Sequence, residues 1–258
     1  MTLYIAAVDE PIYLVPYVRR VIESCGARVV GVAAVSGRPR RRRDSLSLAL
    51  LALVIFSPAQ WLRLARFKAG EWAAAIGLGT PRHRLSDVCQ DLSVPFRRIE
   101  SVNDAGFVAH LSDLGVDVLL HQTPQFLRAA VLRTPRLGVV NRHLSLLPAY
   151  RGAWPIFWQC AHREATVGVT IHLVDAGLDT GEILAQASVA RQPSETTPKL
   201  LRRLFDRSVG LTCEALTRLE AGAPRMANAG PGASVYGTPR PIDVVRYLLG
   251  LPPRPQAG

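Results

Sequence analysis

The sequence has no apolar run long enough to cross a bilayer and no recognisable export signal. Its most apolar stretch, residues 46–56, has 11 residues, whereas a membrane-spanning helix needs about 20. The opening residues, MTLYIAAVDEP, carry an acidic pair where a signal peptide has small residues before its cleavage site. We therefore expect a cytoplasmic protein.

Cysteine is scarce and lacks the spacing of metal sites. No Cys-x-x-Cys pair occurs, which argues against a zinc site, and a chain of 258 residues can bury a core without disulfides. The sequence therefore predicts no metal site and reduced thiols at all four cysteines, which are Cys25, Cys89, Cys160 and Cys213.

Lysine is almost missing, since only Lys68 and Lys199 are lysines among 31 cationic residues. The formal net charge is nevertheless +11, and it is unevenly distributed. Residues 38–84 carry ten cations and two acids, whereas residues 85–185 carry eight cations and ten acids. A uniformly basic surface would indicate nucleic-acid binding, but this distribution predicts a basic patch on one segment.

Apolar runs alternate with stretches of helical spacing along the chain. Strand, helix and strand within the first 35 residues form a βαβ unit, so the sequence predicts the α/β class with a doubly wound, mostly parallel sheet. Ligands of such sheets bind beyond the carboxyl ends of the strands. Thr197 is the expected N-cap of the last helix, with Pro198 in its first turn and Gly222 at its end. Helices are predicted at residues 12–26, 105–115 and 197–222, and strands at 3–8, 28–35, 94–100, 116–121, 137–143 and 167–173.

Residues 38–71 interrupt this pattern with a basic run, the apolar stretch 46–56 and a second basic segment. Three interpretations of the apolar stretch stay open: a helix buried on a face of the sheet, an amphipathic helix on anionic lipid, or a surface for a partner or nucleic acid. The lipid interpretation places residues 38–43, Arg63, Arg66 and Lys68 at the headgroups. It predicts peripheral contact of residues 38–68 with an anionic membrane.

Polar residues at the end of one predicted strand and in one glycine-rich loop make a possible site. Asn141 and His143 are two residues apart and so project to the same side of their strand, and Asp179 lies between Gly177 and Gly181. When an amine attacks a carbonyl, the resulting oxyanion needs a donor such as the Asn141 amide. His143, its pKa raised by the Asp179 carboxylate, would stabilise the same charge or relay the proton of the amine.

The residues around this site form two long motifs. NRHLSLLPAYRG, residues 141–152, resembles the Asn-x-His-x-Ser-Leu-Leu-Pro-x-Tyr-Arg-Gly signature of the 10-formyltetrahydrofolate-dependent formyltransferases. GVTIHLVDAGLDTGEIL, residues 168–184, resembles the motif around the catalytic aspartate of that family. The resemblance is strong over residues 85–190 and weaker over residues 1–37. It implies a formyltransferase domain over residues 1–190, containing the insertion 38–71, and a C-terminal helix with an irregular arm over 191–258 that packs on it.

Carried over residue by residue, the resemblance assigns the catalytic roles to Asn141, His143 and Asp179. It implies 10-formyltetrahydrofolate as the formyl donor, bound mainly through main-chain groups of two segments. The expected donor-binding residues are Gln125, Phe126, Leu127, Val174, Asp175 and Gly177, and the expected acceptor-binding residues are Ser145, Tyr150 and Arg151.

The same resemblance implies an N-formyltransferase acting on a primary amine. SVND at residues 101–104 and PIFW at 155–158 are closer to the members that act on sugars and small molecules, so an amino sugar nucleotide or a specialised metabolite is expected. Methionyl-tRNA is the less favoured acceptor, because fewer than 40 residues follow Gly222 and the segment around the site is slightly acidic. Hydrolysis of formyltetrahydrofolate and a non-catalytic folate-binding or regulatory role are further alternatives.

Overall fold

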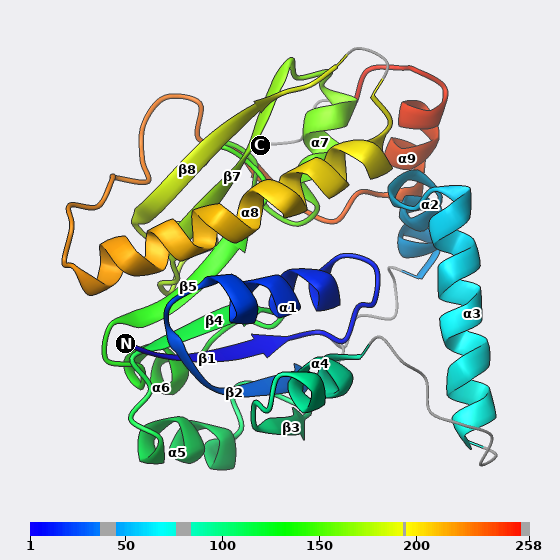
Figure 1. Ribbon diagram of the computed structural model, residues 1–258. Helices are drawn as coiled ribbons and strands as arrows, with labels where there is room; N and C mark the ends of the chain where they lie inside the picture. Colours follow the sequence, from blue (N-terminus) through cyan, green and yellow to red (C-terminus); the bar gives the residue numbers. More distant parts are fainter. Residues whose placement is uncertain (37–44, 76–83, 193–194, 254–258) are drawn as a thin grey trace.

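A seven-stranded sheet forms the centre of the protein (Figure 1). The computed structural model describes residues 1–36, 45–75, 84–192 and 195–253. The strand order is β3-β2-β1-β4-β5-β7-β8. The strands are β1 (Thr2–Ala7), β2 (Arg28–Val35), β3 (Phe96–Ile99), β4 (Val118–Gln122), β5 (Gly138–His143), β7 (Thr166–Leu173) and β8 (Ile183–Ala190).

The pairing of the strands confirms the predicted α/β class with a doubly wound, mostly parallel sheet. β1 to β5 pair in parallel, whereas β7 pairs antiparallel with both β5 and β8. All six predicted strands are present. β8 is missing from the prediction because its sequence, ILAQASVA, has few large apolar residues and a weak alternation.

Helices cover both faces of the sheet. One core lies under α1 (Leu14–Ser24), α4 (Leu85–Asp91), α7 (Pro155–Ala161) and α8 (Thr197–Glu220). A second, smaller core lies on the other face, under α5 (Ala105–Asp113) and α6 (Ala129–Arg133). The carboxyl ends of β4 and β5 therefore reach the edge of the sheet between two helical layers.

The start of α8 corrects the predicted N-cap by one residue. Thr196 has the extended backbone of a cap, with φ −72° and ψ 150°, and Thr197 is the first helical residue. The Thr197 side chain is buried, with its hydroxyl 2.9 Å from that of Tyr247. Pro198 lies in the first turn as predicted, since that position needs no backbone N–H.

The prediction of reduced thiols is wrong for two of the four cysteines. Cys25, directly after α1, forms a disulfide with Cys213 in α8, whereas Cys89 and Cys160 are free and buried. α1 and α8 pack on the same face of the sheet (Figure 1), and this brings together two cysteines that are 188 residues apart.

The described part of the insertion consists of two helices, α2 (Ser45–Ile55) and α3 (Pro58–Ala75). α2 packs against α8 and against α9 (Pro241–Leu248), and its residues Leu51, Val54 and Ile55 are buried. One side of α2 is thus buried, but against the helices α8 and α9, whereas the interpretation expected a face of the sheet. The other side of α2 faces outward, and α3 runs along the outer edge of the molecule (Figure 1).

Two further observations bear on the lipid interpretation. The arginine run at 38–43 lies outside the described residues. Among the helices of the described ranges, none combines the length and the apolar character needed to pass through a bilayer.

The segment after α8 returns to the carboxyl edge of the sheet. β9 (Val235–Tyr236) pairs with β6 (Arg151–Gly152), and Tyr236 stacks on Tyr150 with ring centroids 5.0 Å apart. This second, two-stranded sheet fastens the C-terminal arm to the loop that follows β5.

Candidate active site

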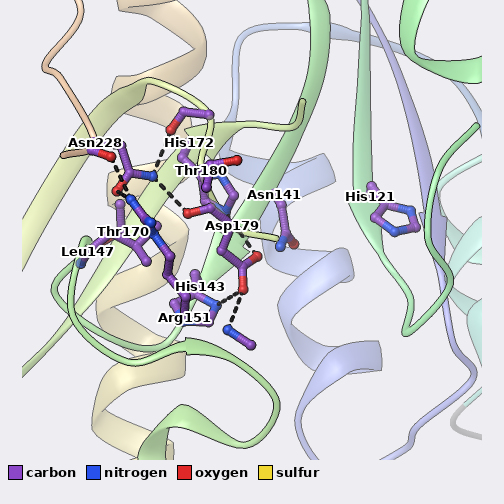
Figure 2. Close-up of polar contacts among 12 residues, drawn as sticks. His121, Asn141, His143, Leu147, Arg151, Thr170, His172, Asp179, Thr180 and Asn228 are labelled. Carbon is purple, nitrogen blue, oxygen red and sulfur yellow. Dashed lines mark hydrogen bonds and ion pairs between the residues drawn. The ribbon is translucent and has the colours of Figure 1, made fainter. Parts of the chain in front are cut away.

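The structure brings Asn141, His143 and Asp179 together at the carboxyl edge of the sheet (Figure 2). Asn141 and His143 lie at the carboxyl end of β5, and Asp179 lies in the loop between β7 and β8. The Nδ1 atom of His143 is 3.5 Å from Oδ2 of Asp179. β7 runs antiparallel to β5 and its last residues pair with Val140 and Asn141, so the loop that follows β7 must fold back to bring Asp179 to His143.

A main-chain N–H and a side-chain amide from two distant segments hold Asp179 in place. The N–H of Gly152 donates to Asp179 Oδ2 at 2.7 Å, and the side-chain amide of Asn228 donates to the carbonyls of Asp179 and Gly181, each at 2.9 Å. Asp179 itself has φ +51°, a left-handed conformation in which aspartate is better tolerated than most residues. The loop, the β5 signature and the C-terminal arm thus fix one carboxylate together.

The ring of His143 has a definite tautomer. Its Nε2 lies 2.7 Å from the carbonyl oxygen of Tyr150, which can only accept, so Nε2 carries a proton and Nδ1 faces Asp179. Burial lowers the pKa of His143 below its ordinary range, and this outweighs the opposite effect of Asp179. The predicted rise of the His143 pKa is therefore wrong: the Asp179 carboxylate acts as expected, but the ring is too deeply buried.

A second histidine, absent from the prediction, faces the same carboxylate. His172 in β7 pairs directly with Asn141 across the sheet, and its Nε2 is 3.7 Å from Oδ1 of Asp179. Burial and the neighbouring His143 lower the pKa of His172 to about 4, so at neutral pH it is uncharged. The sequence could have indicated His172, because it lies in the motif at residues 168–184. Only the β5–β7 register, however, shows that it meets Asn141.

The amide of Asn141 is oriented by a buried network on its other side. The side-chain amide of Gln122, the last residue of β4, donates to Asn141 Oδ1 at 2.9 Å and to the carbonyl of His121 at 2.7 Å. The Nε of Arg142 donates to Gln122 Oε1 at 2.9 Å. With its oxygen accepting from Gln122, Asn141 has its NH₂ group left as a donor.

The predicted donor-binding residues lie on both sides of β5, in the segments that follow β4 and β7. Gln125 accepts from the N–H of Val102 and donates to the Glu100 carbonyl, and the side chain of Phe126 is 75% exposed. Leu127 is half-buried against the smaller core. Two main-chain segments therefore flank Asn141.

The second of these segments is a tight turn. The N–H of Val174 donates to the Val139 carbonyl at 2.7 Å, which continues the sheet beyond β7. Asp175 accepts from the N–H of Gly177 and from the hydroxyl of Thr180. A Cβ at Gly177 would lie 2.0 Å from Thr180 Oγ1, so the turn requires glycine there.

The three predicted acceptor-binding residues use their polar groups within the protein. Ser145 is completely buried and its hydroxyl donates to the Ala149 carbonyl at 2.7 Å. The hydroxyl of Tyr150 donates to Glu164 at 2.5 Å, and Arg151 donates to the carbonyl and side-chain oxygens of Asn228. These hydrogen bonds lie within the protein, and contact of the three residues with an acceptor stays a prediction.

His121 lies on the next strand, aligned with Asn141 in the β4–β5 register (Figure 2). Its Nε2 is 3.0 Å from the Gln125 carbonyl, and its Nδ1 is buried without a partner in the described part of the chain. Burial lowers the pKa of His121 to about 4. It adds a neutral imidazole between the site and the segment 125–127.

This arrangement suits the transfer of an acyl group. An amide donor, a neutral imidazole and a carboxylate converge on one point at a sheet edge, where one can stabilise a developing oxyanion and the others can hold a proton. Among the described residues no group of histidine, cysteine and acidic side chains has the geometry of a metal site.

Comparisons with known proteins identify the family of the chain. The family model described as formyl transferase matches residues 73–216. The methionyl-tRNA formyltransferase of Synechococcus sp. (strain JA-3-3Ab) is 45% identical over 120 residues, which are 46% of this chain and 37% of the relative. That of Paramagnetospirillum magneticum (strain AMB-1) is 36% identical over 173 residues, 67% of this chain and 52% of the relative. The chain thus spans about half the length, or less, of the curated relatives it matches.

Solved structures share the fold at low identity. The phosphoribosylglycinamide formyltransferase of Bacillus halodurans superposes with a TM-score of 0.60 and 18% identity, covering 85% of this chain and 95% of that one. The N-formyltransferase of Helicobacter canadensis, solved with folinic acid and dTDP-3-aminofucose, has a TM-score of 0.57 and 15% identity over 91% of this chain and 70% of that one. By its fold and by a family match that covers more than half of its length, the chain belongs to the formyl transferase family.

Proposed function

We propose that this protein transfers the formyl group of 10-formyltetrahydrofolate to a primary amine of a small molecule. The observation that carries the proposal is the meeting of Asn141, His143 and Asp179 at the sheet edge of a chain of this family. We place the activity in residues 1–190, and we regard residues 191–258 as an extension whose Asn228 and β9 hold the catalytic loops.

Asn141 is proposed to stabilise the oxyanion. As the amine nitrogen bonds to the formyl carbon, the carbonyl electron pair moves to oxygen, and the NH₂ of Asn141 donates to that oxygen. One such donor typically accelerates the step by about 10²–10³-fold. Because its own oxygen accepts from Gln122, Asn141 cannot present the wrong end of its amide without breaking that hydrogen bond.

His143 and Asp179 are proposed to hold the proton that the attacking amine loses. The lone pair of His143 Nδ1 faces Asp179, so a proton placed between them would be shared by an imidazole and a carboxylate. When the intermediate collapses, the bond from carbon to the folate nitrogen breaks and that nitrogen takes up the proton. The neutral state of His143 at rest is what such an acceptor requires.

The donor is proposed to bind along the segments 125–127 and 174–177. These segments follow the two strands that flank β5, so a ligand spanning them would cross directly over Asn141. A structural neighbour, the sugar 3N-formyltransferase WlaRD, was crystallised with dTDP and 5-N-formyl-THF, which supports a folate as the donor.

The charge around the site supports a small acceptor. Residues 85–185 carry eight cations against ten acids, whereas a polyanion such as tRNA favours a basic surround. Sequence identity to methionyl-tRNA formyltransferases supports methionyl-tRNA as the second candidate. An amino sugar nucleotide is the first candidate because a structural neighbour holds dTDP-3-aminofucose.

A direct assay distinguishes the candidates. The protein is incubated with 10-formyltetrahydrofolate and with amino sugar nucleotides, glycinamide ribonucleotide or methionyl-tRNA, and the mass gain of one formyl group is measured on each acceptor. We expect formylation of a small amine. Formylation of methionyl-tRNA alone would replace the acceptor class, and release of formate without any amine would indicate a hydrolase.

A further inference from the structure

The helices α2, α3 and α9 expose an unusual amount of apolar surface. Of the 15 large hydrophobic side chains exposed in the described residues, ten lie on or next to these helices. On α2, Leu46 is 61% and Leu53 is 59% exposed, and the sequence of this helix contains no charged residue. Apolar patches of this extent on a soluble domain typically mark an interaction site.

The exposed residues form stripes on helices that touch. α2 packs against α9, and α9 exposes Ile242, Val245, Leu248 and Leu249 on one side while Val244 is buried on the other. On α2 the exposed side contains Leu46 and Leu53, two turns apart, and Leu51 points inward. We call the exposed apolar side chains of α2 and α9, together with Trp61 and Leu62 near the start of α3, the helical patch.

Cations accompany the helical patch, and acids do not. Arg63, Arg66 and Lys68 are exposed on α3. Between residues 45 and 75 the only acid is Glu71, and the acid of α9, Asp243, is buried as a partner of Arg240. The patch therefore combines exposed leucines with positive charge.

We propose that the helical patch docks this protein onto the surface of an anionic lipid membrane. Leucines beside arginine and lysine match the boundary between acyl chains and anionic headgroups, where the two kinds of contact add. A purely apolar protein partner would leave the cations without a role. With 11 residues, α2 is far shorter than the roughly 20 needed to cross, so it would lie in the interface.

Vesicle co-sedimentation of the full chain tests this proposal. The probes are phosphatidylcholine vesicles with and without phosphatidylglycerol, at low and at high salt. We expect binding only to the anionic vesicles, weakened by salt. Arg63→Glu with Arg66→Glu should reduce binding at least about tenfold. Arg28→Glu with Arg133→Glu, which changes net charge equally on exposed residues of β2 and α6, should reduce it less than about threefold.

Two further outcomes decide against the proposal. An equal loss of vesicle binding in both charge variants would mean that the whole protein is attracted to the anionic vesicles by its net charge, without a docking surface. No vesicle binding, together with self-association that Leu53→Ser with Leu249→Ser abolishes, would assign the patch to a second copy of the chain. The assay contains no folate or amine, so its result is independent of the proposed function.

A different observation carries a second inference, which concerns Arg142. This side chain is buried between the rings of Tyr17 and Phe205, with its guanidinium carbon 4.6 Å and 3.9 Å from their centroids. Burial lowers its pKa to about 10, so it stays cationic at neutral pH without any carboxylate in hydrogen-bonding contact among the described residues. Burial of a cation costs free energy unless the charge is paired or hydrogen-bonded, so the hydrogen bonds of Arg142 are expected to matter for the structure around it.

The hydrogen bonds of Arg142 fix the direction of two amides. A guanidinium only donates, so Gln122 must turn its oxygen to Arg142 and its NH₂ to Asn141. Asn141 must then accept through its oxygen, which leaves its NH₂ as the donor. We infer that Arg142 and Gln122 are positioning residues that hold Asn141 in the orientation the proposed function requires.

Gln122→Glu tests this inference with little change in shape. The carboxylate keeps its contact with Arg142 but cannot donate to Asn141, so we expect kcat to fall about 10–100-fold with the KM for the folate within about twofold. The thermal midpoint should stay close to that of the wild type. Arg142→Lys, which keeps a cationic donor, should retain more activity than Arg142→Met.

The effect must also act through Asn141. In an Asn141→Ala background, adding Gln122→Glu should change kcat by less than about twofold. A rise of KM at unchanged kcat, or equal activity of Arg142→Lys and Arg142→Met, would contradict the inference. If all variants lose both fold and activity while Asn141→Ala stays folded, the network is structural. Failure of the proposed function itself would instead show as activity of Asn141→Ala near that of the wild type.

Discussion

The loop around Asp179 and the helical patch differ in how the chain completes its own contacts. At Asp179 two segments far apart in the sequence supply hydrogen bonds, from the N–H of Gly152 and the side-chain amide of Asn228, and the ring of His143 lies 3.5 Å from the carboxylate. At α2 and α3 the chain buries one side and leaves leucines such as Leu53 outside. The polar groups around Asp179 are hydrogen-bonded within the protein. The exposed leucines of α2 have the composition of a surface that binds another molecule.

The largest effect is expected from Asp179→Asn. An asparagine keeps the shape and can still accept from the N–H of Gly152, but it cannot share the amine proton with His143. We expect kcat to fall by about 10²–10⁴-fold with little change in the free energy of unfolding. Formyl transfer and thermal unfolding are measured together, with Asp113→Asn, an exposed carboxylate on α5, as the control.

Activity of Asp179→Asn near that of the control would remove Asp179 from the proposed chemistry. A loss of activity accompanied by a similar loss of stability would assign the carboxylate to holding the loop. The hydrogen bonds around Asp179 would then serve folding alone.

The motifs explain why this region was predictable from the sequence. The NRHLSLLPAYRG run places Asn141 and His143 two apart on one strand, and the predicted parallel sheet puts that strand end at a ligand-binding edge. Local sequence cannot supply the rest. The β5–β7 register that brings His172 to Asn141 is a long-range pairing, and burial of His143, which reverses the predicted direction of its pKa, depends on packing from several segments.

The helical patch and the disulfide show the same limit. The sequence marks residues 46–56 as apolar but contains no information on which side α8 and α9 cover. Likewise, Cys25 and Cys213 meet only because α1 and α8 share a face of the sheet. Local patterns predict elements, whereas contacts between elements decide exposure, pKa and disulfide pairing.

The next effect concerns acid stability and is centred on His121. Burial lowers its pKa from the ordinary 6.5 to about 4, so the unfolded chain binds this proton more readily than the folded one. The contribution of His121 is therefore complete above pH 6.5 and is lost as the pH falls towards 4, by up to about 3 kcal/mol.

Denaturant unfolding from pH 7 to pH 4 checks this expectation with His121→Gln, which removes the titrating group and keeps a donor for the Gln125 carbonyl. The free energy of unfolding should fall less steeply for the variant than for the wild type. Parallel curves would show that His121 is not desolvated, and the close packing of this side of the site would be in doubt.

A smaller effect is expected at Gly152, which joins the site loop to the C-terminal arm. It has φ +93°, and a Cβ there would lie 2.3 Å from the carbonyl oxygen of Tyr236. Gly152→Ala should lower the free energy of unfolding by roughly 2 kcal/mol and also reduce kcat, because the N–H to Asp179 shifts. Gly237→Ala, where nothing lies within 4 Å, is the matched control and should leave both nearly unchanged.

The smallest effect is expected on the exposed side of α2. Leu53 is 59% exposed, so Leu53→Ala removes little buried surface and should change the free energy of unfolding by less than about 0.5 kcal/mol. Urea unfolding of dilute protein without lipid measures this. A loss above about 2 kcal/mol, as for a buried leucine, would mean that the chain itself covers this side of α2. The protein itself would then bury the apolar side chains of the helical patch, and no exposed apolar surface would be left there for membrane docking.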